Sequence, residues 1–167
     1  MGATDAIEAD MTLEERVVAL MREKKLTLAA AESCTGGMFS ARIIDVPGVS
    51  EVYKAGFVTY ANEAKQKLIG VKEETLRQYG AVSEQTAREM ASGTLQVAEA
   101  DIAVAITGIA GPGGGTEEKP VGLVYIACGS GDKIAIEKCR FSGSRLKIRQ
   151  ASVEHALGML YKEVMKK

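Results

Sequence analysis

The sequence predicts an α/β protein, a three-layer α/β/α sandwich around a mixed β-sheet. Amphipathic helical segments alternate with short apolar strands along most of the chain, and residues 101–107 form a near-continuous apolar run. Two strand-like segments then follow each other directly near the C-terminal end. Alternating strands and helices form parallel sheets covered on both faces, whereas consecutive strands pair as a hairpin. Together these patterns indicate a sheet with both parallel and antiparallel pairs.

Composition limits the classes of protein to consider. The chain has 167 residues, 46% of them apolar, which suffices for one folded domain with a sizeable core. We expect a loose leader over residues 1–11 and a single domain over residues 12–167, since no linker or repeat divides the chain. Lys and Arg together number 21, Asp and Glu 22, and Trp is absent. This balance argues against a nucleic-acid partner, which usually needs a basic excess and aromatic stacking platforms.

The cysteines and the apolar segments indicate the cellular setting. Three cysteines and one histidine offer neither a disulfide framework nor the spacing of a metal site, so we expect no bound metal. A reducing cytoplasm is the simplest setting for free thiols. No stretch has the pattern of a signal peptide or the length of a membrane span, so we expect no membrane partner.

The first half of the chain has recognisable helix starts. Thr12 and Glu15 have the spacing of a capping box, and apolar residues follow at helical intervals. Ser83 precedes a longer helical pattern in a similar way. In order, we expect a helix over 13–24, a strand over 26–31, a helix from Thr35 to the stop at Pro47-Gly48, a strand over 50–60 with a bulge at Gly56, short helices over 62–68 (capped by Asn62) and 73–79, and a helix from 84 to about 97.

The second half contains a central strand, a loop and a hairpin. The apolar run over 101–107 suits a strand covered on both faces. Five glycines and a proline over 108–115 exclude regular structure there. A Gly-Asp pair separates two strands over 121–128 and 133–140 and is typical of a hairpin turn. Ser144 then caps a final amphipathic helix.

The segment Ala31-Glu-Ser-Cys-Thr-Gly-Gly37 is the first candidate for chemistry. It joins an apolar strand to a helix, and such a junction presents free backbone N–H groups and the positive end of a helix dipole. Ser33 therefore lies beside an expected oxyanion site and is a candidate nucleophile. An ordinary helix-capping serine explains the same residue about equally well. Cys34 is the rival nucleophile, but His155 lies far along the chain in a helix, so a Cys-His pair has weak support.

A serine without a nearby histidine needs another base, and lysine is that base in Ser-Lys hydrolases. Lys65 follows the second strand, whose carboxyl end is expected beside that of the first, where α/β sheets bind ligands. Lys65 is the best base candidate, with Tyr60 to relay or orient the proton, although spacing alone favours an ordinary surface lysine. Ser50 is a second hydroxyl, which could serve the Ser-Lys pair or bind substrate.

Two further groups of residues are candidates for ligand contact. Thr107, Gly108 and Gly111 begin a glycine-rich loop at the carboxyl end of the central strand, where backbone N–H groups can approach an anion closely. The loop lacks the spacing of a P-loop or a dinucleotide fingerprint, and a flexible connection is the alternative. Arg145 and Arg149 are one helical turn apart and suit phosphate or carboxylate, although two solvated surface charges are the simpler explanation.

Several long motifs in this order resemble the C-terminal domain of the CinA (competence/damage-inducible protein A) family, with its stand-alone nicotinamide-nucleotide amidases. The likeness runs from about residue 12 to the C-terminus. One departure is Ser144, where relatives often have Asp; it affects a helix cap and not the chemistry. The motifs are Ala-Glu-Ser-Cys-Thr-Gly-Gly from residue 31, Gly-Phe-Val-Thr-Tyr-Ala-Asn-Glu-Ala-Lys from 56, Gly-Ala-Val-Ser-Glu from 80, Gly-Ile-Ala-Gly-Pro-Gly-Gly from 108 and Lys-Pro-Val-Gly from 119.

The resemblance implies a reaction, a fold and a set of roles. The reaction is hydrolysis of nicotinamide mononucleotide to nicotinate mononucleotide and ammonia, a pyridine-nucleotide salvage step without metal or cofactor. The implied fold is that of the anticodon-binding domain. The resemblance also implies a homo-oligomer that binds a small pyridine mononucleotide as its substrate. The implied roles are nucleophile for Ser33 (with Ser50 left open as the attacking hydroxyl), base for Lys65, assistance from Tyr60, oxyanion stabilisation near Thr35, Gly36 and Gly37, and ribose and phosphate contacts from the Thr107-Gly108 loop with Gly111, Arg145 and Arg149.

A second class of function fits the same motifs. A non-catalytic nucleotide-binding or regulatory module, linked to competence or a damage response, uses the same binding residues. Such a module binds the nucleotide without turning it over, so a turnover measurement separates the two hypotheses.

Overall fold

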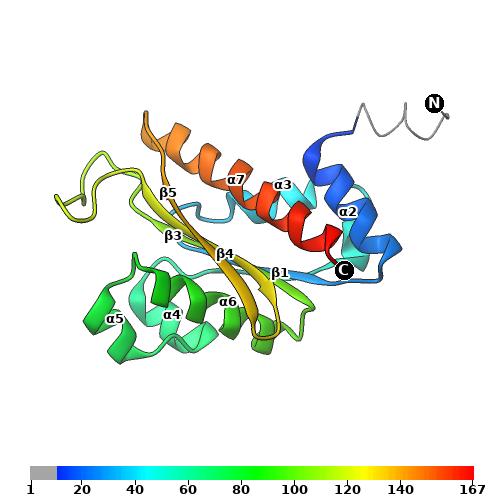
Figure 1. Cartoon of the computed structure of the whole chain (residues 1–167), viewed down its shortest axis with the longest axis horizontal. Helices are drawn as coiled ribbons and strands as arrows, with labels where there is room; N and C mark the ends of the chain where they lie inside the picture. Colours follow the sequence, from blue (N-terminus) through cyan, green and yellow to red (C-terminus); the bar gives the residue numbers. More distant parts are fainter. Residues whose placement is uncertain (1–10) are drawn as a thin grey trace.

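A computed structural model describes residues 11–167 and shows a three-layer sandwich, as the sequence predicts (Figure 1). The expected leader over 1–11 lies outside the described residues except for Met11. The sheet contains β1 (Leu28–Glu32), β2 (Tyr53–Val58), β3 (Ile102–Gly108), β4 (Leu123–Ser130) and β5 (Lys133–Arg140).

The five strands lie in the order β2-β1-β3-β4-β5. β1 is parallel to both β2 and β3, whereas β3 pairs with β4, and β4 with β5, in antiparallel fashion. The expected mixed sheet is therefore confirmed. Because β1, β2 and β3 run the same way, the loops that follow them emerge at one edge of the sheet.

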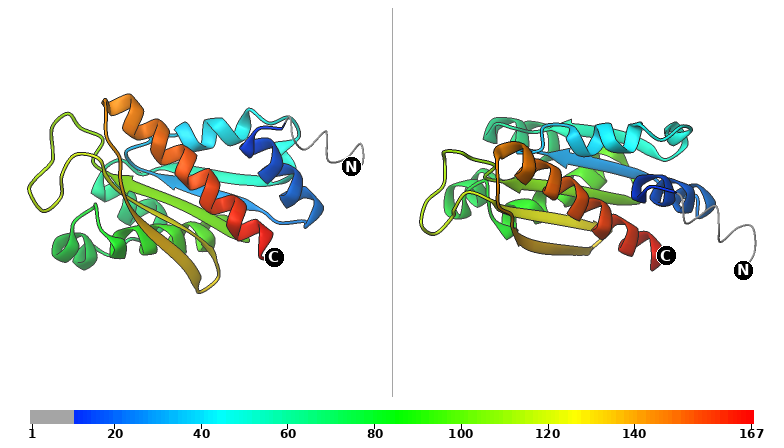
Figure 2. Two further views of the ribbon diagram at one scale, coloured as in Figure 1. Left: turned by 45° about the horizontal axis from the view of Figure 1, so that its top comes forward. Right: turned by 90° about the horizontal axis from the view of Figure 1, so that it is seen from above.

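Helices cover both faces of the sheet (Figure 2). In β3, Val104 and Ile106 belong to the core on the α7 side, while Ala103 and Ala105 belong to the core on the α6 side. The small alanines let α6 lie close to the sheet. One layer consists of α2 (Leu13–Glu23), α3 (Met38–Ile44) and α7 (Arg145–Met165), and the other of α4 (Asn62–Ile69), α5 (Glu73–Tyr79) and α6 (Glu84–Ala98).

Local signals in the sequence predict several element ends correctly. Thr12 and Glu15 form the expected capping box, in which Thr12 N–H donates to the Glu15 carboxylate at 2.7 Å. Ser83 and Ser144 accept hydrogen bonds from the first turns of α6 and α7. A turn at Gly131 joins β4 to β5 as a hairpin. These ends depend on neighbours in sequence, which is why short motifs predict them.

Other local expectations are wrong. The helix expected from Thr35 begins at Met38, because residues 34–37 form turns. The irregularity in β2 lies at Lys54, which the register of β1 skips, and not at Gly56. Asn62 is the first residue of α4 and does not cap it; Ala61 holds that position.

α4 approaches α6 closely because α6 has a glycine at the crossing. A Cβ atom at Gly93 would lie 1.7 Å from the carbonyl oxygen of Ile69, the last residue of α4. No side chain fits into that space. Gly93 therefore sets the position of α4 and of Lys65, which α4 carries.

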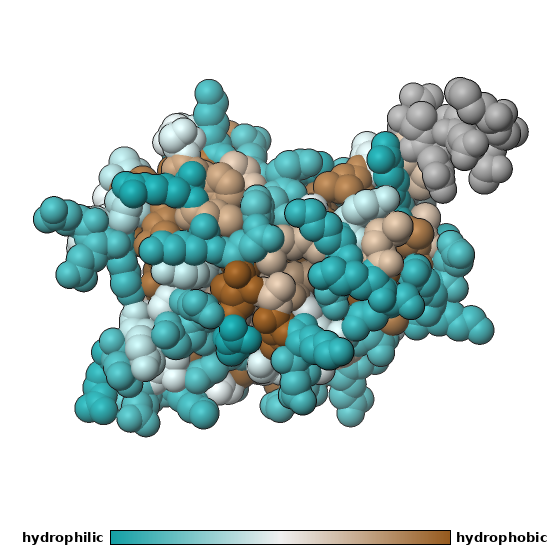
Figure 3. Space-filling model, in the orientation of Figure 1, coloured by the Kyte–Doolittle hydropathy of each residue, from teal (hydrophilic) through white to brown (hydrophobic). Residues whose placement is uncertain are grey.

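The surface differs in character from the two cores. Most of the face shown in Figure 3 is hydrophilic, and a group of apolar residues shows in its middle, where the edge strand β5 crosses. Along residues 11–167, every helix is too short or too polar to cross a bilayer.

Candidate active site

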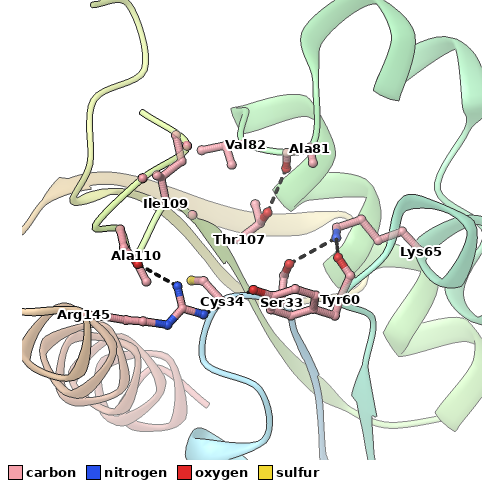
Figure 4. Close-up of a pocket in the computed structure, with 14 residues that line it drawn as sticks. Ser33, Cys34, Tyr60, Lys65, Ala81, Val82, Thr107, Ile109, Ala110 and Arg145 are labelled. Carbon is pink, nitrogen blue, oxygen red and sulfur yellow. Dashed lines mark hydrogen bonds between the residues drawn. The ribbon is translucent and has the colours of Figure 1, made fainter. Parts of the chain in front are cut away.

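The segments at the carboxyl ends of β1, β2 and β3 surround a cavity of about 270 Å³ (Figure 4). Ser33 follows β1, Tyr60 follows β2, and Thr107 lies at the end of β3. Each strand therefore delivers one polar residue to the same place. The lining residues are Ser33, Cys34, Tyr60, Lys65, Ala81, Val82, Thr107, Gly108, Ile109, Ala110, Gly111, Gly113, Gly114 and Arg145.

Ser33 and Lys65 are brought into contact from positions 32 residues apart. Lys65 Nζ lies 3.1 Å from Ser33 Oγ. Only 1% of Lys65 and 8% of Ser33 is exposed. The Ser33 backbone is tied to β3, since its N–H donates to Ile106 O at 2.9 Å. The alternative of a solvated surface lysine is therefore wrong.

Burial changes the acid–base chemistry of Lys65. Removal from water disfavours the ammonium form and lowers the Lys65 pKa from 10.5 to about 8. Across residues 11–167, no carboxylate lies in ion-pair contact with this lysine. A pKa of about 8 leaves about one tenth of the amine neutral at pH 7, a usable fraction for a base.

The neighbours of Lys65 Nζ also direct its lone pair. Nζ donates to Thr59 O at 2.7 Å and to Tyr60 O at 3.2 Å. A neutral amine has two N–H bonds and one lone pair, so the two carbonyls occupy both N–H bonds. The lone pair is then left for the third neighbour, Ser33 Oγ, whose proton it can accept. The arrangement is that of a general base beside a hydroxyl nucleophile.

The Glu32 carboxylate organises the turn that follows Ser33. It is 1% exposed, and it accepts hydrogen bonds from the backbone N–H groups of Gly37, Phe39 and Ser40 at 2.9–3.2 Å. The Ser40 hydroxyl adds a fourth bond at 2.7 Å. The N-terminal end of α3 is thus satisfied by the chain itself. The expectation that this helix end is open to a substrate anion is wrong.

The expected oxyanion donors are also only partly free. The N–H of Gly36 donates to Ser33 O at 3.1 Å, and the N–H of Gly37 donates to a carboxylate at 3.2 Å. Thr35 is fully buried and its side chain does not line the cavity. Over the described range 11–167, the N–H groups of Cys34 and Thr35 have no acceptor. Cys34 directly follows the serine and lines the cavity, and an N–H at that position is a common oxyanion donor.

Arg149 holds the turn that follows Ser33 from the side facing away from the cavity. Its Nε donates to Cys34 O at 3.0 Å and its Nη2 donates to Thr35 O at 2.9 Å. The guanidinium is therefore occupied by protein carbonyls, and Arg149 is not among the cavity residues. The expected role of Arg149 as a substrate contact does not fit this placement.

Arg145 lies in the cavity wall. It donates to Gly111 O at 2.8 Å and to the Tyr60 hydroxyl at 3.2 Å. Tyr60 is 61% exposed, and it touches Lys65 through its backbone carbonyl. Because the Tyr60 hydroxyl bonds Arg145 rather than Lys65 or Ser33, the expected proton relay is absent from this arrangement.

The glycine loop lies opposite the Ser-Lys pair. Thr107 Oγ1 donates to Ala81 O at 2.8 Å, which joins the end of β3 to the segment before α6. Gly108 and Gly111 have no room for a side chain: a Cβ on Gly108 would lie 2.6 Å from β4, and one on Gly111 would lie 2.4 Å from Val121. Gly111 also has a φ of 74°. The glycines are therefore required by the path of the loop.

Ser50 lies outside the site, which corrects the expectation that it could attack or assist. It is exposed, in the short 3-10 helix Val49–Glu51 that precedes β2. Ser33 lies at the opposite end of the neighbouring parallel strand. The five steps from Tyr53 to Val58 separate the two ends by about 16 Å.

The rival nucleophile is disfavoured as well. Burial raises the pKa of the Cys34 thiol to about 11, so the thiol stays protonated at neutral pH. His155 bonds Glu137 at 2.5 Å on the α7 side of β5 and does not line the cavity.

Sequence reasoning missed Glu32 and the part of the cavity wall formed by Ala81 and Val82. An acidic residue at the end of a wholly buried strand was the available signal for Glu32.

Fold and site together define an α/β protein with a cavity at the carboxyl edge of a mixed sheet, and a buried Ser-Lys pair lies in the wall of this cavity. The profile of the CinA C-terminal domain matches residues 10–164. The chain belongs to the CinA C-terminal domain family.

Sequence relatives are longer than this chain. A protein named "Putative competence-damage inducible protein" from Caldicellulosiruptor bescii is 52% identical over 153 residues, which are 92% of this chain and 37% of that protein. A protein of the same name from Clostridium perfringens is 52% identical over 159 residues, 95% of this chain and 39% of that one. The chain thus spans less than two fifths of the length of these relatives.

Solved structures show the same fold. The competence/damage inducible protein CihA of Agrobacterium tumefaciens has a TM-score of 0.88 and 45% identity, covering 90% of this chain and 92% of that one. A CinA superfamily protein from Klebsiella pneumoniae has a TM-score of 0.89 and 35% identity, covering 93% and 97%. These names state no reaction and no ligand.

Proposed function

We propose that the chain hydrolyses nicotinamide mononucleotide to nicotinate mononucleotide and ammonia through a Ser-Lys mechanism. The observation that carries the proposal is the 3.1 Å contact between Ser33 Oγ and the buried, ion-pair-free Lys65 Nζ. The resemblance to nicotinamide-nucleotide amidases supplies the substrate. The protein acts in the cytoplasm as a homo-oligomer in this proposal.

The reaction proceeds in two stages with balanced protons. Neutral Lys65 takes the Ser33 proton while Oγ attacks the carboxamide carbon, and the oxyanion accepts a hydrogen bond from the Cys34 N–H. The Lys65 ammonium then returns the proton to the departing amide nitrogen, which leaves as ammonia. A water attacks the resulting ester, again with Lys65 as base, and releases the carboxylate and Ser33.

The hydrogen-bond donors around the cavity suit a phosphorylated substrate. With the carboxamide at Ser33, the rest of the nucleotide extends along the glycine loop toward Arg145. In the part of the chain that the structure describes, the N–H groups of Ala110, Gly111 and Gly113 have no acceptor. Such N–H groups, together with a guanidinium, are typical partners of a phosphate.

The direct test is ammonia release from nicotinamide mononucleotide by the purified protein. We expect turnover that EDTA does not reduce, and loss of turnover with retained folding in Lys65→Ala. The matched control is Lys67→Ala, since Lys67 is an exposed lysine on the same helix. Full activity of the Lys65→Ala variant would rule out the Ser-Lys mechanism.

The test also reports on the alternative. If the wild-type protein binds the nucleotide but releases no ammonia over long incubation, the chain is a nucleotide-binding or regulatory module and not an amidase. Light scattering of the purified protein checks the oligomeric state.

A further inference from the structure

We propose that Glu137, Cys139 and His155 form a binding site for a borderline-soft divalent cation, of which Zn²⁺ is the best match. One donor atom from each residue lies within 4.8 Å of the other two. A carboxylate oxygen, a thiol sulfur and an imidazole nitrogen are the donor types that zinc sites combine. The site is separate from the cavity that holds Ser33.

The fold creates this cluster from two elements. Glu137 and Cys139 are two residues apart on β5, so both project to the same face of the sheet. Cys139 belongs to the core on the α7 side, and α7 brings His155 to that face. The sequence alone gives no metal-ligand spacing because the histidine is 16 positions or more from both partners and reaches them only through packing.

The distances require only small adjustments. Typical Zn–N, Zn–O and Zn–S bonds place tetrahedral donor atoms about 3.3–3.7 Å apart. His155 Nε2 and Glu137 Oε2 are hydrogen-bonded to each other at 2.5 Å, and the remaining separations are at most 4.8 Å. The side chains of His155 and Glu137 are 37% and 44% exposed, so their ends can shift by about 1 Å to admit a cation between them.

The chemistry of binding is a proton exchange. The cation replaces the Cys139 thiol proton, which leaves to solvent, and takes the neutral imidazole nitrogen and one carboxylate oxygen as further ligands. Three protein ligands leave a fourth position for water. No other step is needed, and no oxidant or reductant takes part.

A cation here would fasten α7 to β5. In the sheet, Cys139 pairs with Val124, which pairs with Gly108 of the glycine loop, so the cluster lies two strands from the cavity wall. α7 also carries Arg145 and Arg149, which contact the cavity and the nucleophile loop. The cation would therefore add to the stability of the α7–β5 contact, while both arginines are held in place by protein carbonyls.

The test uses the full chain, treated with a chelator and then dialysed free of it, with Zn²⁺ and Co²⁺ as probes. We expect one Zn²⁺ per chain in competition with a chromophoric chelator, a rise in Tm with Zn²⁺, and a thiolate-to-metal charge-transfer band with Co²⁺. Cys139→Ser should abolish the band and lower zinc affinity at least about tenfold. His155→Gln and Glu137→Gln, both at partly exposed positions, should weaken zinc binding without impairing folding.

The other two cysteines are matched controls. Cys34 and Cys128 are buried free thiols outside the cluster, so Cys34→Ser and Cys128→Ser should keep the Co²⁺ band. No Co²⁺ band in the wild type, or a band that survives Cys139→Ser, would overturn the proposal. None of these measurements involves turnover, so the test of the metal site is independent of the test of the amidase proposal.

Discussion

Arg149 holds the peptide carbonyl of Cys34 from 115 positions along the chain, with Nε 3.0 Å from that oxygen. In a peptide plane the carbonyl and the following N–H point in opposite directions. Fixing the Cys34 carbonyl toward α7 therefore fixes the Thr35 N–H on the other side of the loop. Arg149 is a positioning residue for the segment that presents the candidate nucleophile.

Replacing Arg149 with Met should slow the chemical step more than it weakens substrate binding. Two carbonyls lose a charged donor, the loop after Ser33 gains freedom, and a displacement of about 1 Å at the nucleophile costs roughly 100-fold in kcat. KM should change little because Arg149 does not line the cavity. Steady-state kinetics give both constants.

Arg88→Met is the matched control for Arg149, since Arg88 is a surface arginine paired with Glu84. It should leave kcat unchanged. Arg149→Lys should recover part of the lost kcat because lysine can donate to one of the two carbonyls. A raised KM at unchanged kcat in Arg149→Met would instead indicate direct contact with substrate.

The pH dependence of kcat/KM should follow the ionisation of Lys65. The neutral amine is the base, and burial sets its pKa at about 8. The rate constant should rise about tenfold per pH unit below pH 8 and level off above it. A flat profile from pH 6 to 9 would be incompatible with Lys65 as the base.

The same ionisation affects stability with a definite sign. Between about pH 8 and 10.5, the unfolded chain binds the Lys65 proton and the folded chain does not. The contribution of Lys65 to the free energy of unfolding should therefore rise with pH across this window. Denaturant titrations of wild type and Lys65→Met at pH 7.5 and 10 isolate this contribution.

The two candidate serines should behave differently. Ser33→Ala removes the hydroxyl that contacts Lys65 and should lower kcat roughly 10³-fold or more. Ser50→Ala changes an exposed hydroxyl at the far edge of the sheet and should leave kcat within about twofold. Equal losses of kcat in both variants would contradict this assignment and would indicate that Ser50 acts at the site of another copy of the chain.

Arg145 should determine the preference for a phosphorylated substrate. Arg145→Met removes the guanidinium in the cavity wall, so KM for nicotinamide mononucleotide should rise about tenfold or more. The corresponding nucleoside, which lacks the phosphate, should be affected much less. The ratio of kcat/KM for the two substrates measures this directly, and an unchanged ratio would place the phosphate elsewhere.

The crossing of α4 and α6 should be intolerant of a side chain. Gly93→Ala would place Cβ against the Ile69 carbonyl and should destabilise the fold by about 1–3 kcal/mol or more. Gly158→Ala is the matched control, because a Cβ there meets nothing within 4 Å inside α7 and should stabilise the helix by about 0.5–1 kcal/mol. Thermal unfolding of both variants provides the comparison.

The sequence predicts much of this fold because the residues that start helices and form turns act on near neighbours in the chain. Thr12, Ser83 and Ser144 mark helix starts through bonds to residues three positions away. The apolar run of β3 and the turn at Gly131 likewise depend on neighbours in sequence. The order of the strands is not local, and the alternation of strands and helices followed by two consecutive strands predicts only that the sheet is mixed.

The site was only partly predictable because its details depend on contacts between distant segments. The carboxyl ends of parallel strands account for Ser33 beside Lys65. Spacing alone does not reveal that Glu32 fills the end of α3, or that Arg149 turns away from the cavity toward Cys34. Ser50 illustrates the opposite error: it is closer to Ser33 in sequence than Lys65 is, yet it lies at the other edge of the sheet.

The packing of α2 beside α7 has a practical consequence. The C-terminus, marked C in Figure 1, and α2 both lie at the end of the molecule remote from the glycine loop. A purification tag or a fused domain attached after Lys167 would therefore extend away from the mouth of the cavity. Immobilisation through the C-terminus should leave the cavity accessible, which makes the chain suitable for surface-coupled binding measurements.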